Sequence, residues 1–377
     1  MILANANVMC DDFTLRVCDI EITDGIITKV GTNLPGCSRL DMHGKLILPG
    51  FIDTHIHGAY GIRISDPAPD VDLITTFEAT QGVTALAITT ATSEFSDILR
   101  QIRTAKEAAT HHAGAKIVGI HAEGPFISPK YKGAMTADYI LPPNKDKLES
   151  MIEAAGGLLK IITIAPEQPC AIDLISYAVS RGLTVSIGHS NATYEDTLAA
   201  INAGASALTH TFNAMRPLNH REPGILGAAL SVPSITCEVI CDYVHLHPSI
   251  VLMIYTLKGK DHMRIISDSG HAAGMNVSEF MVDGQMRYVK DGVVRLADGT
   301  IAGSAKTMLD GVRNLFNSGV PLEDISQMAS LNPAKCLGID HITGSITIGK
   351  SADLVVLDQS LNVINTYVNG ECVYEQH

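Results

Sequence analysis

The sequence predicts an α/β protein, a (β/α)8 TIM barrel with a small β-sandwich domain built from both termini. In the middle of the chain, apolar strand-like runs alternate with helical stretches, and both ends are rich in short β-like pieces. The 377 residues suffice for a barrel of roughly 250 residues and a smaller second unit. We therefore expect residues 1–48 and 341–377 to form the small domain, and residues 49–340 to form the barrel.

Eight apolar runs supply the expected barrel strands. They are Leu46–His57, Val83–Thr90, Lys116–Glu123, Lys160–Ala165, Leu183–His189, Ala205–His210, Ile235–Cys241 and Met263–Asp268. Strands that alternate with helices are typical of a parallel sheet, and eight is the strand count of the closed barrel. A doubly wound open sheet fits the same alternation and stays open as an alternative.

Helices are expected between most of these runs. They cover Phe95–Ala109, Ala171–Arg181 and Tyr194–Ala203, which is followed by Gly204 as a C-cap would be. The connection Leu218–Ser231 has an irregular and only weakly helical pattern. We also expect a hairpin insertion around 280–296, followed by a helix over Ala305–Phe316.

The two ends carry strand and turn signals. The strand-like pieces are Asp19–Ile22, Gly25–Val30, Ser345–Ile348, Asp353–Leu357 and Val363–Val368. Asn369-Gly370 is a strong hairpin turn, and Thr23-Asp24-Gly25 is a second turn. Two β-rich ends around one different middle indicate that the termini fold together.

The charge and the cysteines exclude several classes of protein. A formal net charge of −13 disfavours nucleic acid and anionic membranes as partners, while a few local donors can still hold a small anion. The eight cysteines form no CxxC pair, and no secretory signal or membrane span is visible. We expect a reduced, cytoplasmic protein.

Five of the apolar runs end in ionisable side chains. The endings are Asp53-Thr54-His55-Ile56-His57, His121-Ala122-Glu123, Gly188-His189-Ser190, Thr209-His210-Thr211 and Ser267-Asp268-Ser269. The active sites of barrels form at the carboxyl ends of the strands, where these groups would converge. Several histidines with carboxylates at one mouth make a metal site.

Each of these residues also has a structural interpretation. His55 and His57 are two apart and share one face of a strand, as core histidines can. Glu123 can cap the next segment, and His189 can belong to an ordinary strand-to-helix turn. His121 reads equally well as a buried interior histidine. Five strand ends with matching chemistry nevertheless favour the metal site over these separate explanations.

A divalent cation held by imidazoles and a carboxylate lowers the pKa of bound water to about 7. An aspartate at the end of the last strand can accept the water proton and pass it to a leaving nitrogen. The constellation therefore predicts hydrolysis of an amide or a related C–N bond. It leaves the substrate open.

The sequence resembles the N-acetylglucosamine-6-phosphate deacetylases of the amidohydrolase superfamily over nearly its whole length. The matching segments include 48–58, 121–129, 188–192, 209–215, 220–224, 302–304, 332–334 and 349–355. The segments 121–129 and 209–224 are much more particular to this family than the others. The resemblance implies a deacetylase that releases acetate from an N-acetylated amino sugar 6-phosphate.

The resemblance also implies roles for single residues. Glu123, His189 and His210 match the ligands of the main metal ion, and Asp268 matches the catalytic acid/base. His55 and His57 match a pair that holds a second ion in some members. The substrate-binding positions are Arg221, which is similar to a phosphate-binding arginine supplied across a dimer interface, the backbone at Asn213-Ala214, and His245.

Three positions depart from the family pattern. Met135 stands where the family usually has a histidine that polarises the acetyl carbonyl, and a thioether cannot donate that hydrogen bond. Asp268 is followed by Ser269-Gly270-His271, where the family has no histidine, and Tyr243 replaces a glycine. We hypothesise that His271 takes over part of the missing role, or that the substrate differs.

Several points stay open at this stage. The favoured ion is zinc, with iron, manganese or cobalt as alternatives, and one or two ions per chain. The substrate is N-acetylglucosamine 6-phosphate or its galactosamine epimer, and a homodimer is expected by analogy. Another amidohydrolase, acting on a cyclic amide or N-acyl compound, and a catalytically inactive binding barrel are the alternative functions.

Overall fold

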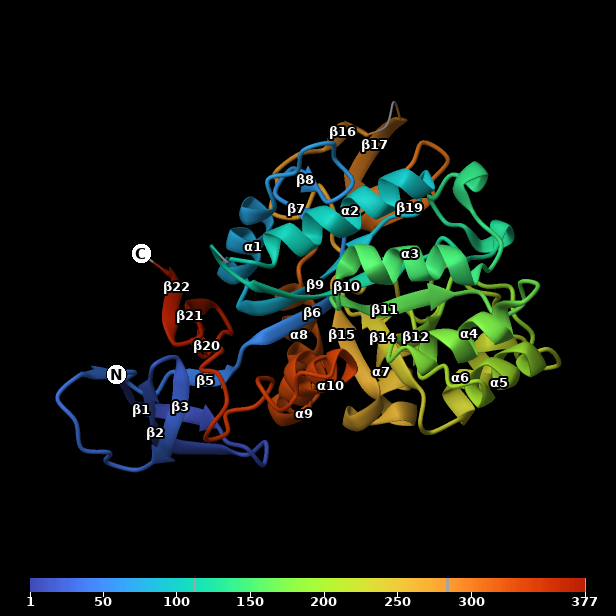
Figure 1. Ribbon diagram of the computed structural model, residues 1–377. Helices are drawn as coiled ribbons and strands as arrows, with labels where there is room; N and C mark the ends of the chain where they lie inside the picture. The colour runs from blue at the N-terminus through green and yellow to red at the C-terminus, as the bar shows by residue number, and fades with distance from the viewer. Residues whose placement is uncertain (112, 283–284, 377) are drawn as a thin grey trace.

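The computed structural model describes residues 1–111, 113–282 and 285–376 (Figure 1). Its centre is an eight-stranded parallel sheet in the order β15-β14-β13-β12-β11-β10-β9-β6. The strands are β6 (Phe51–Ile56), β9 (Val83–Thr90), β10 (Lys116–Glu123), β11 (Leu159–Ile164), β12 (Thr184–Ile187), β13 (Ala207–Leu208), β14 (Thr236–Ile240) and β15 (Met263–Ile266). Strands such as β6 and β9 are buried along their whole length, which explains their continuous apolar runs.

The sheet closes into a barrel at its carboxyl end. The amide of Asp268 donates to the carbonyl of His55 over 3.0 Å, and the amide of His57 donates to the carbonyl of Ser269 over 2.9 Å. These bonds join the first strand to the last. The predicted (β/α)8 barrel is confirmed, and the open sheet is excluded.

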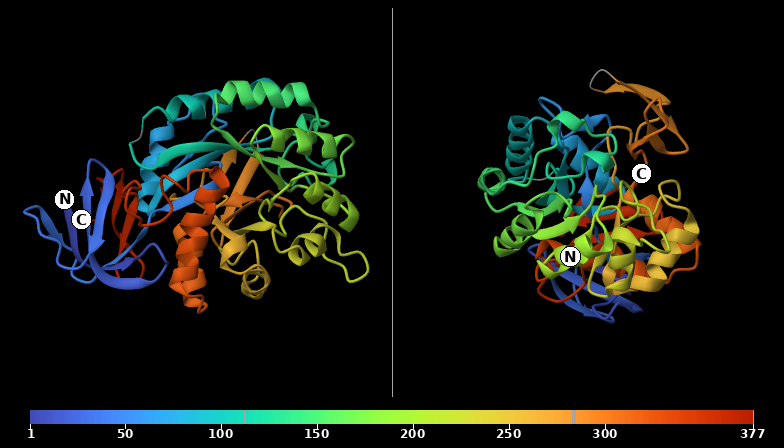
Figure 2. Two further views of the ribbon diagram at one scale, coloured as in Figure 1. Left: turned by 60° about the horizontal axis from the view of Figure 1, so that its bottom comes forward. Right: turned by 90° about the vertical axis from the view of Figure 1, so that its right-hand side faces the viewer.

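Helices cover the outside of the barrel (Figure 2). They are α1 (Val71–Thr80), α2 (Phe95–Ala108), α3 (Lys145–Ala155), α4 (Ala171–Ser180), α5 (Tyr194–Asn202), α6 (Gly224–Ser231), α7 (Pro248–Lys258), α8 (Met308–Asn317), α9 (Leu322–Ser326) and α10 (Asn332–Leu337). The connection Leu218–Ser231, expected to be irregular and only weakly helical, forms the regular helix α6 in its second half. This helix is mostly small and apolar and buries Ile225, Leu226 and Ala228, so it lacks the polar face that signals a helix.

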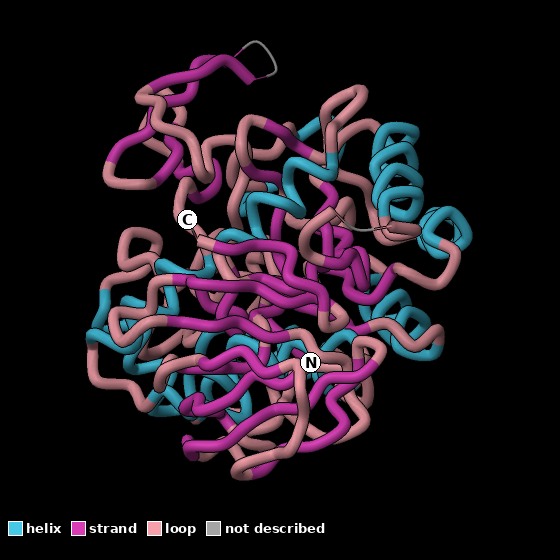
Figure 3. The backbone as a smooth tube through the Cα atoms, turned by 90° about the vertical axis from the view of Figure 1, so that its left-hand side faces the viewer, coloured by secondary structure: helices cyan, strands magenta, loops and turns pink. Residues whose placement is uncertain are grey.

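The two ends of the chain share one sheet, whose strands lie side by side in Figure 3. Its strands are β1 (Ile2–Met9), β2 (Leu15–Thr23), β3 (Ile26–Gly31), β4 (Arg39–Asp41), β5 (Leu46–Pro49), β20 (Leu354–Leu357), β21 (Val363–Val368) and β22 (Glu371–Glu375). A separate hydrophobic core draws on both ends, with Leu3, Ile47 and Leu354 among its members. The domain limits at 48 and 341 stay a prediction.

Two strand predictions need correction. The run Leu46–His57 is two strands, because it changes sheets at Gly50 between β5 and β6. A side chain at Gly50 would meet Thr84 Oγ1 at 2.2 Å, so only glycine fits this crossing. The piece Ser345–Ile348 is not a strand, although Ile346 is buried in the terminal core.

An insertion follows the last barrel strand and projects from the barrel in Figure 2. It forms a four-stranded antiparallel sheet of β16 (Glu279–Val282), β17 (Gln285–Lys290), β18 (Val293–Arg295) and β19 (Ile301–Ser304). The predicted hairpin is thus extended by β19. A short pair, β7 (Gly58–Ala59) and β8 (Ile62–Arg63), follows the first barrel strand. Among the described helices, none has the length and apolar character required to cross a bilayer.

One ion pair ties the barrel to the terminal sheet. Lys116 Nζ on β10 lies 2.8 Å from a carboxylate oxygen of Asp353, whose side chain is fully buried.

Lys116→Met would leave that carboxylate without its cation, and we expect the free energy of unfolding to fall by about 3 kcal/mol. Denaturant unfolding followed by circular dichroism measures it. The control Lys29→Met removes an exposed pair with Glu21 and should cost less than about 1 kcal/mol; equal losses in the two variants would contradict this account.

Candidate active site

The ionisable groups at the strand ends converge on the carboxylate of Glu123. Its Oε1 lies 3.1 Å from His189 Nε2, 2.9 Å from His210 Nε2 and 3.4 Å from His55 Nε2. Its Oε2 lies 3.2 Å from His57 Nε2. Four imidazoles from three strand ends therefore face one buried carboxylate.

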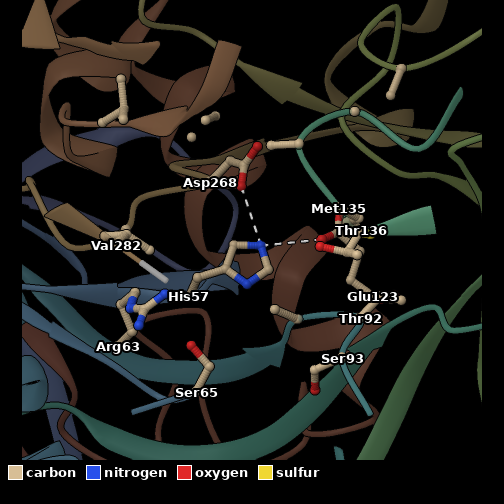
Figure 4. Close-up of a pocket in the computed structure, with 18 of the residues that line it drawn as sticks. His57, Arg63, Ser65, Thr92, Ser93, Glu123, Met135, Thr136, Asp268 and Val282 are labelled. Atoms are coloured by element: carbon tan, nitrogen blue, oxygen red, sulfur yellow. Dashed lines mark hydrogen bonds and ion pairs between the residues drawn. The ribbon is translucent and has the colours of Figure 1, made fainter. Parts of the chain in front are cut away.

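These side chains form two clusters with the spacing of metal ligands. Ligands 2.0–2.1 Å from a tetrahedral ion lie about 3.3 Å from one another. Glu123, His189 and His210 meet this spacing, because the two histidine Nε2 atoms are 3.1 Å apart. His55, His57 and Asp268 form the second cluster, with Asp268 Oδ1 3.6 Å and 3.5 Å from the two Nε2 atoms. Figure 4 shows His57 between Asp268 and Glu123.

The tautomers of two histidines leave lone pairs available to bind a cation. His57 Nδ1 lies 3.1 Å from the carbonyl of Thr89, and His189 Nδ1 lies 2.8 Å from the carbonyl of Tyr131. A carbonyl only accepts, so each Nδ1 carries the proton and each Nε2 turns a lone pair toward the cluster. Each of the two clusters thus contains one histidine with a lone pair suited to a divalent ion, and outer carbonyls of this kind are typical of metal-binding histidines.

The backbone at the strand ends is strained in a way that serves this convergence. His189, His210 and Asp268 have positive φ values of 47°, 27° and 48°. Non-glycine residues in this region cost of order 1–3 kcal/mol each and cluster at functional sites. The strained turns carry all three side chains to the barrel mouth.

The electrostatics favour positive charge at the centre. Burial would raise the pKa of Glu123, but His55 and His189 outweigh it and hold the pKa well below its usual range. Burial would lower the pKa of His55, yet the carboxylates of Glu123 and Asp268 raise it well above the ordinary value. A divalent cation satisfies the same demand for positive charge.

A cavity of about 1160 Å³ opens above the clusters. It is lined by most of the predicted substrate-binding residues, namely Met135, Asn213, Ala214, His245 and His271. The insertion contributes Phe280, Val282 and Arg287 to the same lining. The insertion therefore forms one wall of the cavity.

His245 and His271 have different surroundings. His245 Nδ1 lies 2.7 Å from Asp242 Oδ2, which leaves Nε2 for a ligand. The His271 ring stacks on Phe280, with centroids 4.5 Å apart. Burial and the charge of Arg63 lower the pKa of His271, which favours its neutral imidazole.

Arg221 does not line the main cavity. It lies with Lys130, Tyr131 and Arg216 on a second cavity of about 480 Å³. Lys130 and Tyr131 line both cavities, so the two adjoin. The alternative of an Arg221 ion pair with Glu222 is not seen, because Glu222 pairs with Arg216 over 2.5 Å.

Sequence reasoning missed Glu238, Arg264 and Asp242 as parts of this site. Glu238 Oε2 lies 3.4 Å from His55 Nδ1, and its other oxygen pairs with Arg264 over 2.8 Å. Both charges are buried within apolar strands, where the surrounding residues gave no functional signal. His121 is fully buried and lies outside both clusters, with its ring nitrogens on the Thr54 carbonyl and the Thr163 hydroxyl.

The amidohydrolase family model matches residues 46–373 of the chain. The chain belongs to the amidohydrolase family. N-acetylglucosamine-6-phosphate deacetylase of Bacillus subtilis (strain 168) is 36% identical over 369 residues, covering 94% of this chain and 92% of that protein. N-acetylgalactosamine-6-phosphate deacetylase of Escherichia coli O157:H7 is 35% identical over 364 residues, covering 96% of this chain and 94% of that one.

The fold of this amidohydrolase also matches that of a solved structure. It is N-acetyl-D-glucosamine-6-phosphate deacetylase from Mycobacterium smegmatis, an aspartate-to-alanine variant in complex with N-acetyl-D-glucosamine-6-phosphate. The match has a TM-score of 0.90 at 33% identity and covers 99% of both chains. The resemblance to this deacetylase group is thereby confirmed, and the family is metal-dependent.

Proposed function

We propose that this amidohydrolase removes the acetyl group from an N-acetylated amino sugar 6-phosphate and releases acetate. The observation that carries the proposal is the pair of ligand clusters around Glu123 at the barrel mouth, in a chain similar throughout to deacetylases of both epimeric sugars. An inactive barrel would be expected to lack ligands or the aspartate, and all are present. Hydrolysis of another small amide is not favoured, because the named relatives are sugar-phosphate deacetylases.

Two ions are proposed, one at Glu123, His189 and His210, and one at His55, His57 and Asp268. Zinc suits this donor set of histidines and carboxylates, as do iron, manganese and cobalt. When bound, such an ion makes water acidic and polarises a carbonyl. All five histidine and glutamate ligands are proposed from spacing and from family position, and the tautomers of His57 and His189 support two of them.

Asp268 is proposed as the acid and base. Its Oδ1 faces both His55 and His57, so Oδ2 remains to take a proton from the attacking water. The carboxyl group then delivers that proton to the sugar nitrogen as the C–N bond breaks. Asp268 is 15% exposed at its side chain and lines the cavity, so a substrate can reach it.

The phosphate is proposed to lie toward the junction of the two cavities. Asn213 and Ala214 line the main cavity, and Arg221, Lys130 and Arg216 supply positive charge on the adjoining one. A guanidinium matches phosphate geometry. His245 is proposed to contact the sugar through its free Nε2.

A homodimer and a cytoplasmic location complete the proposal. Arg221 sits beside the main cavity rather than in it, an arrangement that leaves room for an arginine from a second copy to complete the phosphate site. The eight cysteines are free thiols, as expected in a reducing compartment.

Acetate release from N-acetylglucosamine 6-phosphate and N-acetylgalactosamine 6-phosphate tests the function. We expect turnover of at least one epimer, loss of turnover after chelation, and recovery with Zn²⁺ or another divalent ion. Asp268→Asn should lower kcat by about 10²–10⁴-fold, because the proton acceptor is lost. Full activity in a sample shown to be metal-free would contradict the mechanism, and no turnover of either epimer would contradict the substrate.

His271 and Met135 form a paired test of carbonyl polarisation. Both line the cavity, and neutral His271 retains a ring N–H to donate. We expect His271→Ala to lower kcat and the double variant with Met135→His to restore part of it. His271→Phe is the matched control, since it keeps the stacking on Phe280 without the donor. Full kcat in His271→Ala would show that His271 has no such role.

A further inference from the structure

A buried charge network lies directly behind the second ligand cluster. Glu238 on β14 and Arg264 on β15 are partners in the register of the two strands, and the carboxylate and guanidinium are 2.8 Å apart. Their side chains are 0% and 2% exposed. The other oxygen of Glu238 lies 3.4 Å from Nδ1 of His55, which is fully buried as well.

The network determines which nitrogen of His55 carries a proton. The Glu238 carboxylate accepts a hydrogen bond from the Arg264 guanidinium over 2.8 Å, and this buried ion pair keeps the carboxylate ionised. An ionised carboxylate only accepts hydrogen bonds, so His55 must present Nδ1–H to it. When His55 is neutral, as a metal ligand must be, its lone pair is then on Nε2, which lies 3.3 Å from His57 Nε2 and 3.6 Å from Asp268 Oδ1.

A third ion between His55, His121 and Glu238 is the competing explanation, since their ligand atoms also lie close together. The contacts argue against it. His121 Nδ1 lies 3.1 Å from the carbonyl of Thr54, and its Nε2 lies 2.8 Å from the hydroxyl of Thr163, so both ring nitrogens are engaged.

We propose that Glu238, with Arg264 as its counter-charge, is a positioning residue that sets the tautomer of His55 and thereby the affinity of the ion subsite formed by His55, His57 and Asp268. This inference rests on the proposed two-ion arrangement. Arg264 has a second role, because it prevents Glu238 from adding an uncompensated negative charge beside Asp268 and Glu123. Support of this kind behind a metal-binding histidine affects affinity by about 10–100-fold.

The geometry makes an unusual prediction for the variant Glu238→Gln. Arg264 offers only donors, so it attracts the amide oxygen of the new side chain and leaves the NH₂ group facing His55 Nδ1. His55 must then accept at Nδ1 and carry its proton on Nε2, where it blocks the ion. Removing the guanidinium as well frees the amide oxygen to turn back toward His55.

Zinc titration calorimetry of the metal-free full chain tests the proposal. We expect two sites in the wild type, and in E238Q a Kd about 10–100-fold weaker for one site only. In E238Q/R264M that Kd should return toward the wild-type value, a rescue that a merely structural role would not give. The control Glu78→Gln, at another fully buried carboxyl group, should leave both values unchanged.

Three outcomes would overturn the inference: a single site in the wild type, an unchanged second site in E238Q, or no recovery in the double variant. Acetate release by the wild type is measured separately, so the proposed function stands or fails on its own result. A measurement on the wild type does not depend on whether the variants fold. Long-range ¹H–¹⁵N spectra of the wild-type histidines should show His55 protonated at Nδ1, and a proton on Nε2 instead would also overturn the inference.

Discussion

The meeting of four imidazole nitrogens around the Glu123 carboxylate is the constraint that organises this protein. The carboxylate belongs to one cluster and contacts the other, since one of its oxygens faces His189 and His210 and the other faces His57. A buried carboxylate surrounded by lone pairs is stable only with positive charge among them. The requirement for a cation is therefore part of the architecture of the barrel mouth.

The barrel meets this requirement through its closure and its strained strand ends. Hydrogen bonds between the ends of β6 and the segment after β15 bring His55, His57 and Asp268 together, although about two hundred residues separate the two segments. Positive φ values at His189, His210 and Asp268 then direct these side chains to one point. The stability of the closed sheet offsets the strain, which is why it is tolerated at the site.

Much of this was predictable from the sequence. Eight apolar runs predicted the eight strands of the barrel. The ionisable residues at the ends of these runs predicted the members of the two clusters, because parallel strands place their carboxyl ends on one rim. The limits of prediction are equally physical. The crossing at Gly50 was missed because two consecutive strands form one apolar run. The segment of α6 had only a weak helical pattern because the helix is mostly apolar and largely buried.

The buried pair of Glu238 and Arg264 shows a different limit. Each is a single charged residue within an apolar strand, and its partner becomes visible only when β14 and β15 are aligned. Arg221 shows the reverse case, since family resemblance suggested its role while the chain places it on an adjoining cavity. The local sequence pattern does not predict the role of a side chain that acts through a neighbouring strand or in a second copy of the chain.

Anomalous X-ray diffraction at the zinc edge from zinc-loaded crystals tests the central claim most directly. The account predicts a peak within bonding distance of Glu123 Oε1 and the Nε2 atoms of His189 and His210, with a second peak between His57 and Asp268. Zinc bound elsewhere, with Glu123 making only hydrogen bonds to its histidines, would contradict it.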